Sequence, residues 1–169
     1  AGGKSLAFAA AMQDRGEILA CDVRAPALAQ LGLRAARAGI HIIRTYLSDG
    51  GPPSGLYDRV FVDAPCIGSG TWRRQPELKW RLTPKRLADM QALQDRLLEE
   101  GAALVGLQGR LLYATCSILP SENEDRIAAF LARHRRHIHR TDYRHLAPHL
   151  SGDTFGNLLG PPLVLRRDV

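Results

Sequence analysis

Apolar residues in this chain follow two alternating patterns, short continuous runs and longer stretches at helical spacing. The short runs predict strands at residues 17–23, 40–46, 58–63 and 110–114. The stretches at helical spacing predict helices at residues 6–12, 26–38, 84–105 and 121–134. Because strands alternate with helices, the order is typical of βαβ units. We therefore predict an α/β fold with a mostly parallel sheet.

Local signals mark the starts of the last two predicted helices. Thr83 and Pro84 provide an N-cap and a first-turn proline for the longer helix. We expect its apolar positions to lie in the core: Leu87, Met90, Leu93, Leu97 and Leu98. Ser121 and Glu124 have the spacing of a capping box, which predicts that the final helix opens at Ser121.

Length and composition favour a single domain over residues 1–169, since 169 residues with 45% hydrophobic content can bury one core. The chain has no run of eighteen apolar residues, so we expect no membrane span. Its net charge of +6 suits a polyanionic partner, although many basic proteins bind none. The three cysteines form no CxxC pair, which favours free thiols and a cytoplasmic setting.

Acidic residues and cysteines follow several of the predicted strands. In an open α/β sheet, ligands bind beyond the carboxyl ends of the strands. We expect one edge of the sheet to carry Asp22, Asp49, Asp63, Cys66 and Cys116. A cysteine near helix N-termini and cations can ionise and act as a nucleophile, whereas a single cysteine is often an inert buried residue. Two cysteines together with an acid favour a catalytic site over inert packing. We expect Lys4 to supply positive charge at the same edge.

A glycine turn, Gly2-Gly3-Lys4, precedes the first predicted helix. Glycine lets the backbone approach a ligand closely, and a helix N-terminus favours negative charge, but an ordinary tight turn has the same sequence. Asp22 lies about 20 residues further on, where dinucleotide-binding folds hold ribose hydroxyls. A helix cap is the alternative role for Asp22, and the pattern leaves both open.

Three motifs resemble those of the RNA 5-methylcytosine methyltransferases of the RsmB/Sun/Nop group. Residues 63–66 (DAPC), with Ser69-Gly70-Thr71, Arg74 and Lys79-Trp80, resemble its motif IV. Residues 113–117 (YATCS) and 120–124 (PSENE) resemble its motif VI and the helix that follows. Residues 1–4 (AGGK) resemble the back half of motif I. The resemblance spans residues 1–134 and implies a Rossmann-like fold that uses S-adenosylmethionine (SAM).

The resemblance implies a covalent mechanism at cytosine. In this family the motif VI cysteine, here Cys116, adds as a thiolate to carbon 6 of the base, and carbon 5 then takes the methyl group from SAM. The motif IV cysteine, here Cys66, helps to release the product. Asp63 is similar to the acid that hydrogen-bonds the cytosine ring, and Lys4 resembles the active-site lysine.

The cofactor contacts also follow from the resemblance. Asp22 matches the acid on the SAM ribose, and Asp49 matches the acid near the adenine amine. The implied cofactor residues are Ala1, Gly2, Gly3, Lys4, Asp22, Asp49 and Asp63. We expect no metal. Four histidines of the tail interleave with arginines but lack the fixed spacing and the acidic or thiol company of a metal site: His137, His139, His145 and His149.

Basic and aromatic residues surround the motif IV loop: Arg73, Arg74, Lys79, Arg81, Lys85 and Arg86, with Trp72 and Trp80 among them. Single-stranded RNA is commonly held by arginines on phosphates and aromatic rings on bases. We therefore expect Arg73, Arg74 and Lys79 to contact RNA. The alternative is that Trp80 packs against the core while the charges are only solvated. We expect the RNA to be 16S rRNA and the protein to be a cytoplasmic monomer.

The chain departs from the family pattern at both ends. Residue 1 already lies in the glycine turn, so the family's first strand precedes the sequence, which also lacks an initiating Met. Residues 163–166 fit a strand, but the usual closing strand does not follow. We expect a fragment of the catalytic domain, truncated at both ends and without the first strand, that binds SAM weakly and methylates poorly in isolation.

Three functions fit the sequence. The first is an RNA cytosine-5 methyltransferase, and the second is a non-enzymatic RNA-binding or ribosome-assembly protein that kept the fold. The third is a SAM-dependent enzyme that acts on tRNA or DNA. The retention of both Cys66 and Cys116 argues against the second function, because a protein that only binds RNA has no need of two thiols.

Overall fold

The computed structural model describes residues 2–134, 138–141 and 163–167, which fall into two compact units. The first unit covers residues 1–54 and the second covers residues 55–169. Among the described helices, none combines the length and the apolar character that crossing a membrane requires.

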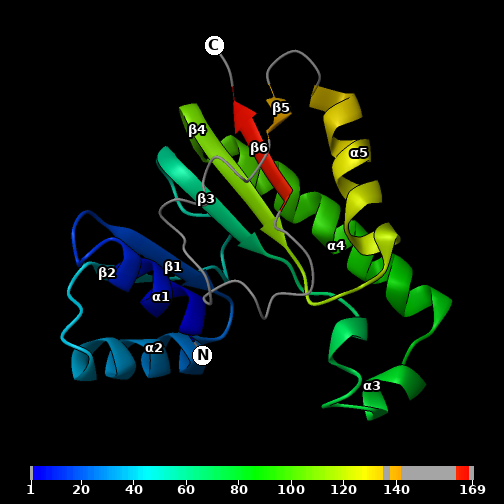
Figure 1. The fold of residues 1–169 in the computed structure, drawn as a ribbon, viewed down its shortest axis with the longest axis horizontal. Helices are drawn as coiled ribbons and strands as arrows, with labels where there is room; N and C mark the ends of the chain where they lie inside the picture. Colours follow the sequence, from blue (N-terminus) through cyan, green and yellow to red (C-terminus); the bar gives the residue numbers. More distant parts are fainter. Residues whose placement is uncertain (1, 135–137, 142–162, 168–169) are drawn as a thin grey trace. The chain divides into compact units, whose positions relative to one another are not determined.

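The first unit is a βαβ unit with one additional helix (Figure 1). Strands β1 (Ile18–Asp22) and β2 (Ile43–Leu47) pair in parallel, and α2 (Ala25–Arg37) connects them. Helix α1 (Gly3–Ala11) precedes β1. Helix α2 buries Leu31 and Ala35, one turn apart on the same face, so its apolar stripe forms the core of this unit. These elements confirm the predicted order.

The second unit contains a four-stranded sheet in the order β3-β4-β6-β5. Its strands are β3 (Tyr57–Asp63), β4 (Val105–Ala114), β5 (Ile138–Thr141) and β6 (Leu163–Arg167). Strands β3 and β4 pair in parallel, whereas β6 is antiparallel to both β4 and β5. The parallel arrangement predicted for the helix-linked strands is therefore confirmed, and β6 is the strand predicted at residues 163–166.

Three helices and two short 3-10 turns complete the described part of the second unit. The turn η1 (Ser69–Thr71) and helix α3 (Glu77–Trp80) follow β3. Helix α4 (Pro84–Ala103) connects β3 to β4, and η2 (Pro120–Glu122) leads from β4 to α5 (Glu124–His134). The Thr83 cap is confirmed, because its Oγ1 accepts a hydrogen bond of 3.1 Å from the Arg86 backbone N–H.

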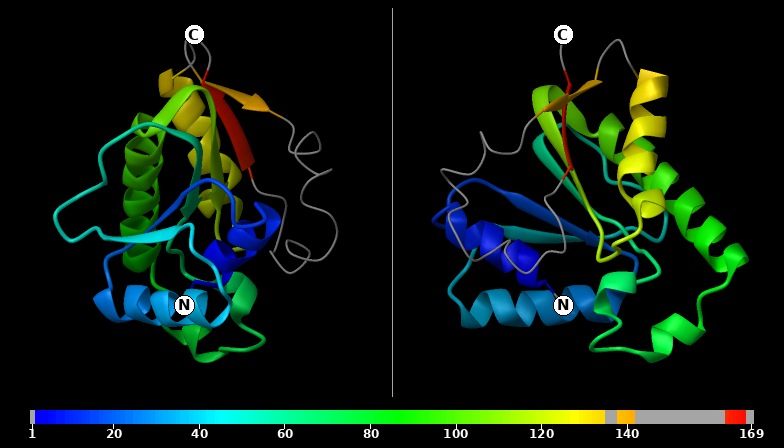
Figure 2. Two further views of the ribbon diagram at one scale, coloured as in Figure 1. Left: turned by 90° about the vertical axis from the view of Figure 1, so that its left-hand side faces the viewer. Right: turned by 45° about the vertical axis from the view of Figure 1, so that its right-hand side comes forward.

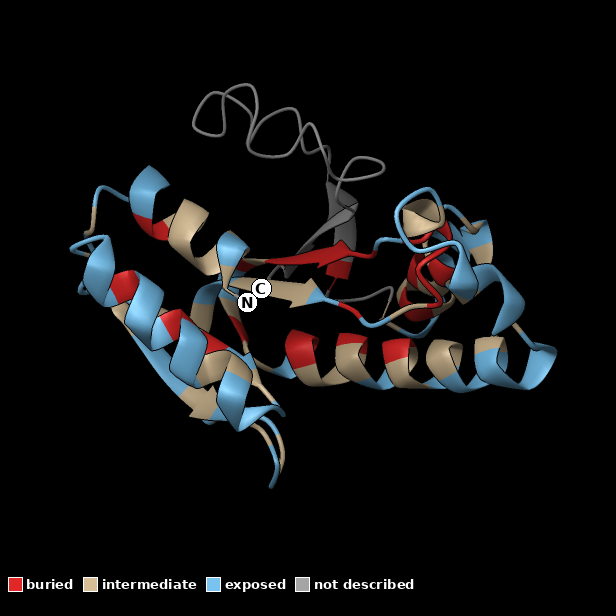
Figure 3. Ribbon diagram, turned by 90° about the horizontal axis from the view of Figure 1, so that it is seen from below, coloured by how far each residue is buried: buried red, intermediate tan, exposed pale blue. Residues whose placement is uncertain are grey.

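Helices α4 and α5 pack beside each other against one face of the β3–β4 sheet (Figure 2). The hydrophobic core forms where these helices meet the sheet, and its buried residues are Ala64, Leu98, Ala102, Val105, Leu111, Tyr113, Ile127, Phe130 and Ile138. Figure 3 shows the buried stretches of α4 and of the strands. Helix α4 approaches the sheet closely at Gly101, where a Cβ atom would lie only 2.8 Å from Val62 Cγ2.

The buried stripe of α4 differs from the predicted one. Leu98 is fully buried, but Leu87, Met90, Leu93 and Leu97 are only half-buried. The fully packed positions are Gln94, Leu98, Gly101 and Ala102. The reason is close packing: small residues let the helix backbone approach the strands, and Gln94 is buried because it has polar partners.

The predicted capping box is not formed. Helix α5 begins at Glu124, after the η2 turn, and in the described part of the chain no hydrogen bond joins Ser121 Oγ to Glu124. Instead the Ser121 carbonyl accepts a hydrogen bond of 3.2 Å from Gln91 Nε2. The neighbouring Asn123 side chain donates to the carbonyls of Ser117 and Leu119, and these contacts set the path of the chain into α5.

Candidate active site

The carboxyl ends of β3 and β4 bring the two cysteine-bearing loops together. Asp63 is the last residue of β3 and lies opposite Ala114 in the parallel register. Beyond the strands, the Ala64 N–H donates to the Ala114 carbonyl at 2.9 Å, and the Gly70 N–H donates to the Cys116 carbonyl at 3.0 Å. The main chain therefore continues the pairing from the strands into both loops.

The two cysteine thiols are in contact at this edge. Cys66 Sγ lies 3.1 Å from Cys116 Sγ, a hydrogen-bonding distance for two sulfurs that are not joined in a disulfide. Cys21 is also a free thiol, so the prediction of free cysteines is confirmed. Cys116 is exposed, whereas Cys66 is half-buried.

Contact with Cys66 and burial set the ionisation of the pair. The hydrogen bond from Cys66 lowers the pKa of Cys116 to about 7, although burial and the charges of Asp63 and Glu122 oppose this shift. The same hydrogen bond, together with burial, raises the pKa of Cys66. Two sulfurs this close ionise in sequence, and the first charge is best placed on the more exposed one. The pair therefore favours the thiolate at Cys116, with Cys66 as the hydrogen-bond donor.

Gly68 turns the loop that carries Cys66. Its φ of +72° lies in the left-handed region that favours glycine. A Cβ atom there would lie 3.2 Å from both Thr71 Oγ1 and Leu78 Cδ1, and 4.0 Å from Cys116 Sγ. Thr71 Oγ1 also donates to the Gly68 carbonyl at 2.8 Å. A side chain at this position would therefore be strained by the backbone and would crowd Thr71 and Leu78.

A pair of buried serines joins the two cysteine-bearing loops. The hydroxyls of Ser69 and Ser117 lie 2.9 Å apart, and Ser69 Oγ accepts from the Ile118 N–H at 2.9 Å. Thr115 Oγ1 donates to Asn123 Oδ1 at 2.7 Å and accepts from the Ser117 N–H at 3.0 Å. Because these hydroxyls are buried and partnered, both loops are fixed in one arrangement.

Two buried residues that the sequence analysis did not single out contribute to this site. Glu122 and Gln94 are both fully buried, and Glu122 Oε1 accepts from the Ile67 N–H and from Gln94 Nε2. The sequence offered one signal, which is that Gln94 is a polar residue at a position where the apolar spacing of α4 predicts burial. Gln94 and Glu122 are 28 positions apart in the sequence, so no local pattern would have paired them.

The residues predicted for the cofactor lie in the first unit, apart from Asp63. Gly2 caps α1 in the left-handed conformation at φ +81°, and a Cβ atom there would meet Leu31 Cδ1 at 2.5 Å. Lys4 lies half-buried in the first turn of α1. Gly3 opens that helix, and Ala1 lies outside the described residues.

Two acids lie together at the carboxyl end of the β1–β2 pair. Asp22 ends β1, and its carbonyl accepts from the Ser48 N–H at 3.1 Å, which brings it next to the turn that carries exposed Asp49. The Asp22 carboxylate binds the Arg24 guanidinium through two hydrogen bonds of 3.0 and 2.9 Å, and these lower the pKa of Asp22. Asp22 Oδ1 also accepts a hydrogen bond of 2.9 Å from the backbone N–H of Arg24, the N-cap residue of α2, so both roles considered for Asp22 stay predictions.

The predicted RNA-contacting residues are exposed around η1 and α3. Arg73, Arg74 and Lys79 all face solvent, and Lys79 Nζ lies 6.0 Å from the centre of the Trp80 ring. Trp80 is 83% exposed, so the alternative that it packs against the core is wrong. Exposed Trp80 and the three basic side chains are therefore accessible to a partner.

Metal binding has no site in the described residues. Within residues 2–134 and the two short strands, His, Cys, Asp and Glu side chains form no cluster that could hold a metal ion. The side chains of His137, His139, His145 and His149 lie outside the described residues.

The fold is that of the SAM-dependent methyltransferases. It superimposes on the crystal structure of PH0851 with a TM-score of 0.77 and 32% identity, over 98% of this chain and 40% of that one. A second similar structure is NSun6 from Pyrococcus horikoshii with SFG, with a TM-score of 0.71 and 23% identity. That match covers 83% of this chain and 36% of that one.

Sequence comparison then gives the family. The model of the 16S rRNA methyltransferase RsmB/F family matches residues 1–152, and the chain belongs to this family. The probable ribosomal RNA small subunit methyltransferase B of Synechocystis sp. is 41% identical over 138 residues, 79% of this chain and 31% of that protein. The corresponding protein of Sodalis glossinidius is 38% identical over 122 residues, 69% of this chain and 28% of that protein. The chain thus spans under a third of these relatives, and the resemblance seen in the motifs is confirmed.

Proposed function

We propose that the protein is an RNA cytosine-5 methyltransferase that uses SAM as its methyl donor and Cys116 as its nucleophile, with 16S rRNA as the substrate. The observation that carries the proposal is the contact of 3.1 Å between Cys66 and Cys116, in which Cys116 has a lowered pKa. Membership of the RsmB/F family supports the choice of rRNA. The cytoplasmic, monomeric state stays a prediction.

Cys116 performs the first step. Its thiolate attacks carbon 6 of the cytosine, a C–S bond forms, and the electron pair of the ring double bond moves to carbon 5, which becomes nucleophilic. A lowered pKa increases the thiolate fraction at neutral pH, which is the requirement for a cysteine nucleophile. Cys116 is exposed, so a flipped base can reach its sulfur.

Cys66 serves product release. When Cys116 is bound to carbon, its charge is gone, and with it the main cause of the raised pKa of Cys66. Cys66 therefore ionises more readily at the stage that needs a base. Its sulfur removes the proton from carbon 5, the C5–C6 double bond re-forms, and Cys116 leaves as a thiolate. Asp63, exposed at the end of β3, is positioned to bond the pairing edge of the base.

The first unit fits SAM by the chemistry of its donors. Asp22 and Asp49 offer carboxylates to ribose hydroxyls and to the adenine amine, and the N-terminus of α1 offers backbone N–H groups after a glycine turn. SAM, when bound, supplies an electrophilic methyl group. Arg24 shares the Asp22 carboxylate, so ribose binding requires Asp22 to divide its oxygens between the two partners.

Trapping of a covalent RNA adduct tests the mechanism. Cys66→Ala in the whole protein should accumulate a protein–RNA adduct through Cys116, because attack remains possible while release is blocked. Cys116→Ala should form none, and Cys21→Ala, which changes a free thiol in the other unit, should behave as wild type. Denaturing gels with small-subunit rRNA measure this. Neither adduct nor methylation in any form of the protein would favour the RNA-binding function instead.

The target is tested separately from the mechanism. Bisulfite sequencing of rRNA and tRNA from cells that lack the gene should show one or more cytosines of 16S rRNA losing methylation. Loss of methylation in tRNA with rRNA unchanged would show that the substrate is tRNA, and the proposed mechanism would still stand.

A further inference from the structure

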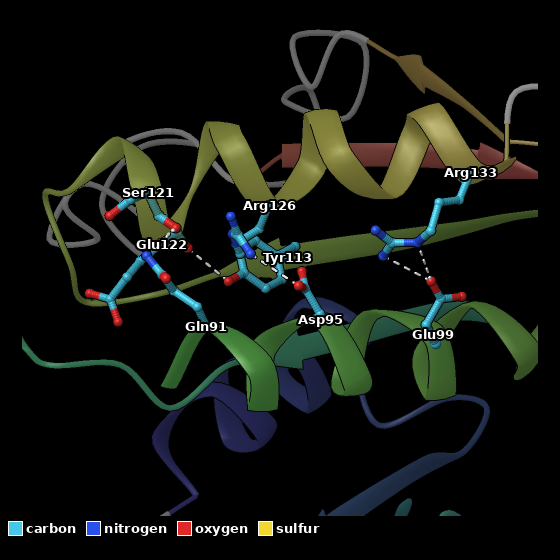
Figure 4. A network of polar contacts seen from close by, with 8 residues as sticks. All are labelled: Gln91, Asp95, Glu99, Tyr113, Ser121, Glu122, Arg126 and Arg133. Carbon is cyan, nitrogen blue, oxygen red and sulfur yellow. Dashed lines mark hydrogen bonds and ion pairs between the residues drawn. The ribbon is translucent and has the colours of Figure 1, made fainter. Parts of the chain in front are cut away.

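Glu122 is a fully buried carboxylate next to the two cysteine-bearing loops. Burial of a carboxylate is costly unless hydrogen bonds compensate it, so a buried acid needs a structural or chemical reason. Glu122 lies in η2, six residues after Cys116, and the proposed mechanism gives it no step. Figure 4 shows it between α4 and α5.

Glu122 and its partner Gln94 together contact the backbone on both sides of Cys66. Its Oε1 accepts from the Ile67 N–H at 3.1 Å and from Gln94 Nε2 at 3.0 Å. Gln94 Nε2 also donates to the Pro65 carbonyl at 2.9 Å. Pro65 and Ile67 are the direct neighbours of Cys66, so the Glu122–Gln94 pair holds the backbone before and after the cysteine.

Glu122 is itself anchored by its backbone. The hydroxyl of buried Tyr113, on β4, donates to the Glu122 carbonyl at 2.8 Å (Figure 4). Gln91 Nε2 of α4 donates to the adjacent Ser121 carbonyl at 3.2 Å. Because β4 also carries the chain into Cys116, one element fixes both the carboxylate and the nucleophile.

The benefit of Glu122 is geometric, since its charge acts in the opposite direction. A negative charge near Cys116 disfavours the thiolate, and the charge of Glu122 does raise the pKa of Cys116. The hydrogen bond from Cys66 is the largest cause of the shift and lowers that pKa. A residue that places Cys66 therefore favours the thiolate more than its own charge opposes it.

We propose that Glu122 is a positioning residue for the thiol pair, whose buried carboxylate, acting with Gln94, holds the Pro65–Ile67 backbone so that Cys66 Sγ faces Cys116 Sγ. The inference rests on the proposed roles of the two cysteines. It assigns a function to a side chain that touches neither sulfur.

Adduct trapping in Glu122→Ala tests the proposal. Without the carboxylate, Cys66 leaves its place while Cys116 can still attack, so adduct should accumulate several-fold above wild type, as in Cys66→Ala. A variant that only unfolds the site would form less adduct than wild type. The direction of the change therefore distinguishes positioning of Cys66 from general loss of structure.

Three further variants sharpen this test. Gln94→Ala removes the donor to Pro65 and should also accumulate adduct, and the double variant with Glu122→Ala should add little to either single change. Glu122→Gln keeps an acceptor oxygen at the same place and should release product as wild type does. Glu124→Ala, an exposed acid two residues away, is the matched control and should leave the adduct level unchanged.

Alkylation of Cys116 gives a readout that needs no RNA. Iodoacetamide labelling against pH, followed by mass spectrometry of the Cys116 peptide, should have a midpoint near 7 in wild type. In Glu122→Ala the midpoint should rise towards about 8.5, the value of an ordinary thiol. In Glu122→Gln it should not rise, because an acceptor remains and a negative charge is removed.

The proposal would be overturned if both Glu122→Ala and Gln94→Ala showed wild-type adduct levels and an unshifted alkylation midpoint. If Glu122→Ala fails to fold, Gln94→Ala alone decides it. Should Cys66→Ala accumulate no adduct, the proposed function fails, and the alkylation midpoints still decide whether Glu122 places Cys66.

Discussion

At the scale of single residues, the two thiols of the pair differ in exposure and in the direction of their pKa shifts. The more exposed sulfur, Cys116, has its pKa lowered to about 7, and the half-buried Cys66 has its pKa raised. Asp63 and Glu122 both place negative charge near Cys116, which opposes its ionisation. The contact of 3.1 Å between the sulfurs outweighs these charges because a hydrogen bond to the charged form acts directly on the ionising atom.

The rate of adduct formation should therefore depend on pH in a defined direction. The pKa of Cys116 is lowered, so the thiolate fraction rises as pH increases through about 7, and the rate should climb from about pH 6 and level off by about pH 8. In Cys66→Ala the hydrogen bond is lost, and the midpoint should move upwards. Rapid-quench trapping of the adduct with wild type and variant measures both midpoints. Identical midpoints would contradict this account of Cys116.

The predictability of the site differs between its residues. Asp63, Cys66 and Cys116 follow strands, and the rule that parallel strands end at one edge was enough to bring them together. Glu122 and Gln94 meet across the core from η2 and α4, where only the packed structure determines the contact. Sequence pattern therefore predicts residues placed by strand ends and misses those placed by helix packing.

At the scale of elements, the packing of α4 explains where the sequence-based expectations were right and wrong. The helix itself was predicted from its cap and its apolar spacing, and both are confirmed. Its buried face was shifted, because Gly101 and Gln94 pack inward in place of larger leucines. Ion pairs between Asp95 and Arg126 and between Glu99 and Arg133 join α4 to α5 along the rim of this contact (Figure 4).

Gly101→Ala should destabilise the second unit by about 1–3 kcal/mol, because the added methyl would lie 2.8 Å from Val62 Cγ2 and 3.1 Å from Leu111 Cδ1. Gly32→Ala is the matched control, since it also lies within a helix and a Cβ atom there meets nothing within 4 Å. That change should stabilise by up to about 1 kcal/mol through helix propensity. Urea denaturation of both variants measures the difference. Equal effects would show that α4 can move away from the sheet.

At the scale of the whole molecule, the excess of positive charge suits the polyanionic substrate that we propose. The chain carries a net charge of +6, and exposed Arg73, Arg74 and Lys79 lie in the segment that follows the Cys66 loop. Exposed Trp80 adds a flat surface on which a base can stack. In the proposed RNA complex, charge contacts depend on salt concentration and stacking does not, so salt separates the two contributions.

Charge removal and ring removal should weaken RNA binding differently. Arg73→Ala, Arg74→Ala and Lys79→Ala should each reduce affinity and lower the slope of log affinity against log salt by about 0.7, as expected for one phosphate contact to a single strand. Trp80→Ala should reduce affinity by about 1–3 kcal/mol and leave the slope unchanged. Fluorescence anisotropy with single-stranded small-subunit rRNA segments at several salt concentrations measures both. A wild-type slope in all three charge variants would place the RNA elsewhere on the protein.

The residues that hold Cys66 in place are far from it in the sequence, which has a consequence for how the site forms during folding. Contacts that bring Cys66 to Cys116 and Ile67 to Glu122 close loops of 50 and 55 residues. Closing loops of that length costs chain entropy that a local helix does not, so we expect the reactive pair to form after the helices during folding. A chain that has formed its helices but not yet the contacts of Cys66 and Ile67 carries two separate thiols with ordinary pKa values. Nucleophilicity at Cys116 is thus coupled to completion of the fold.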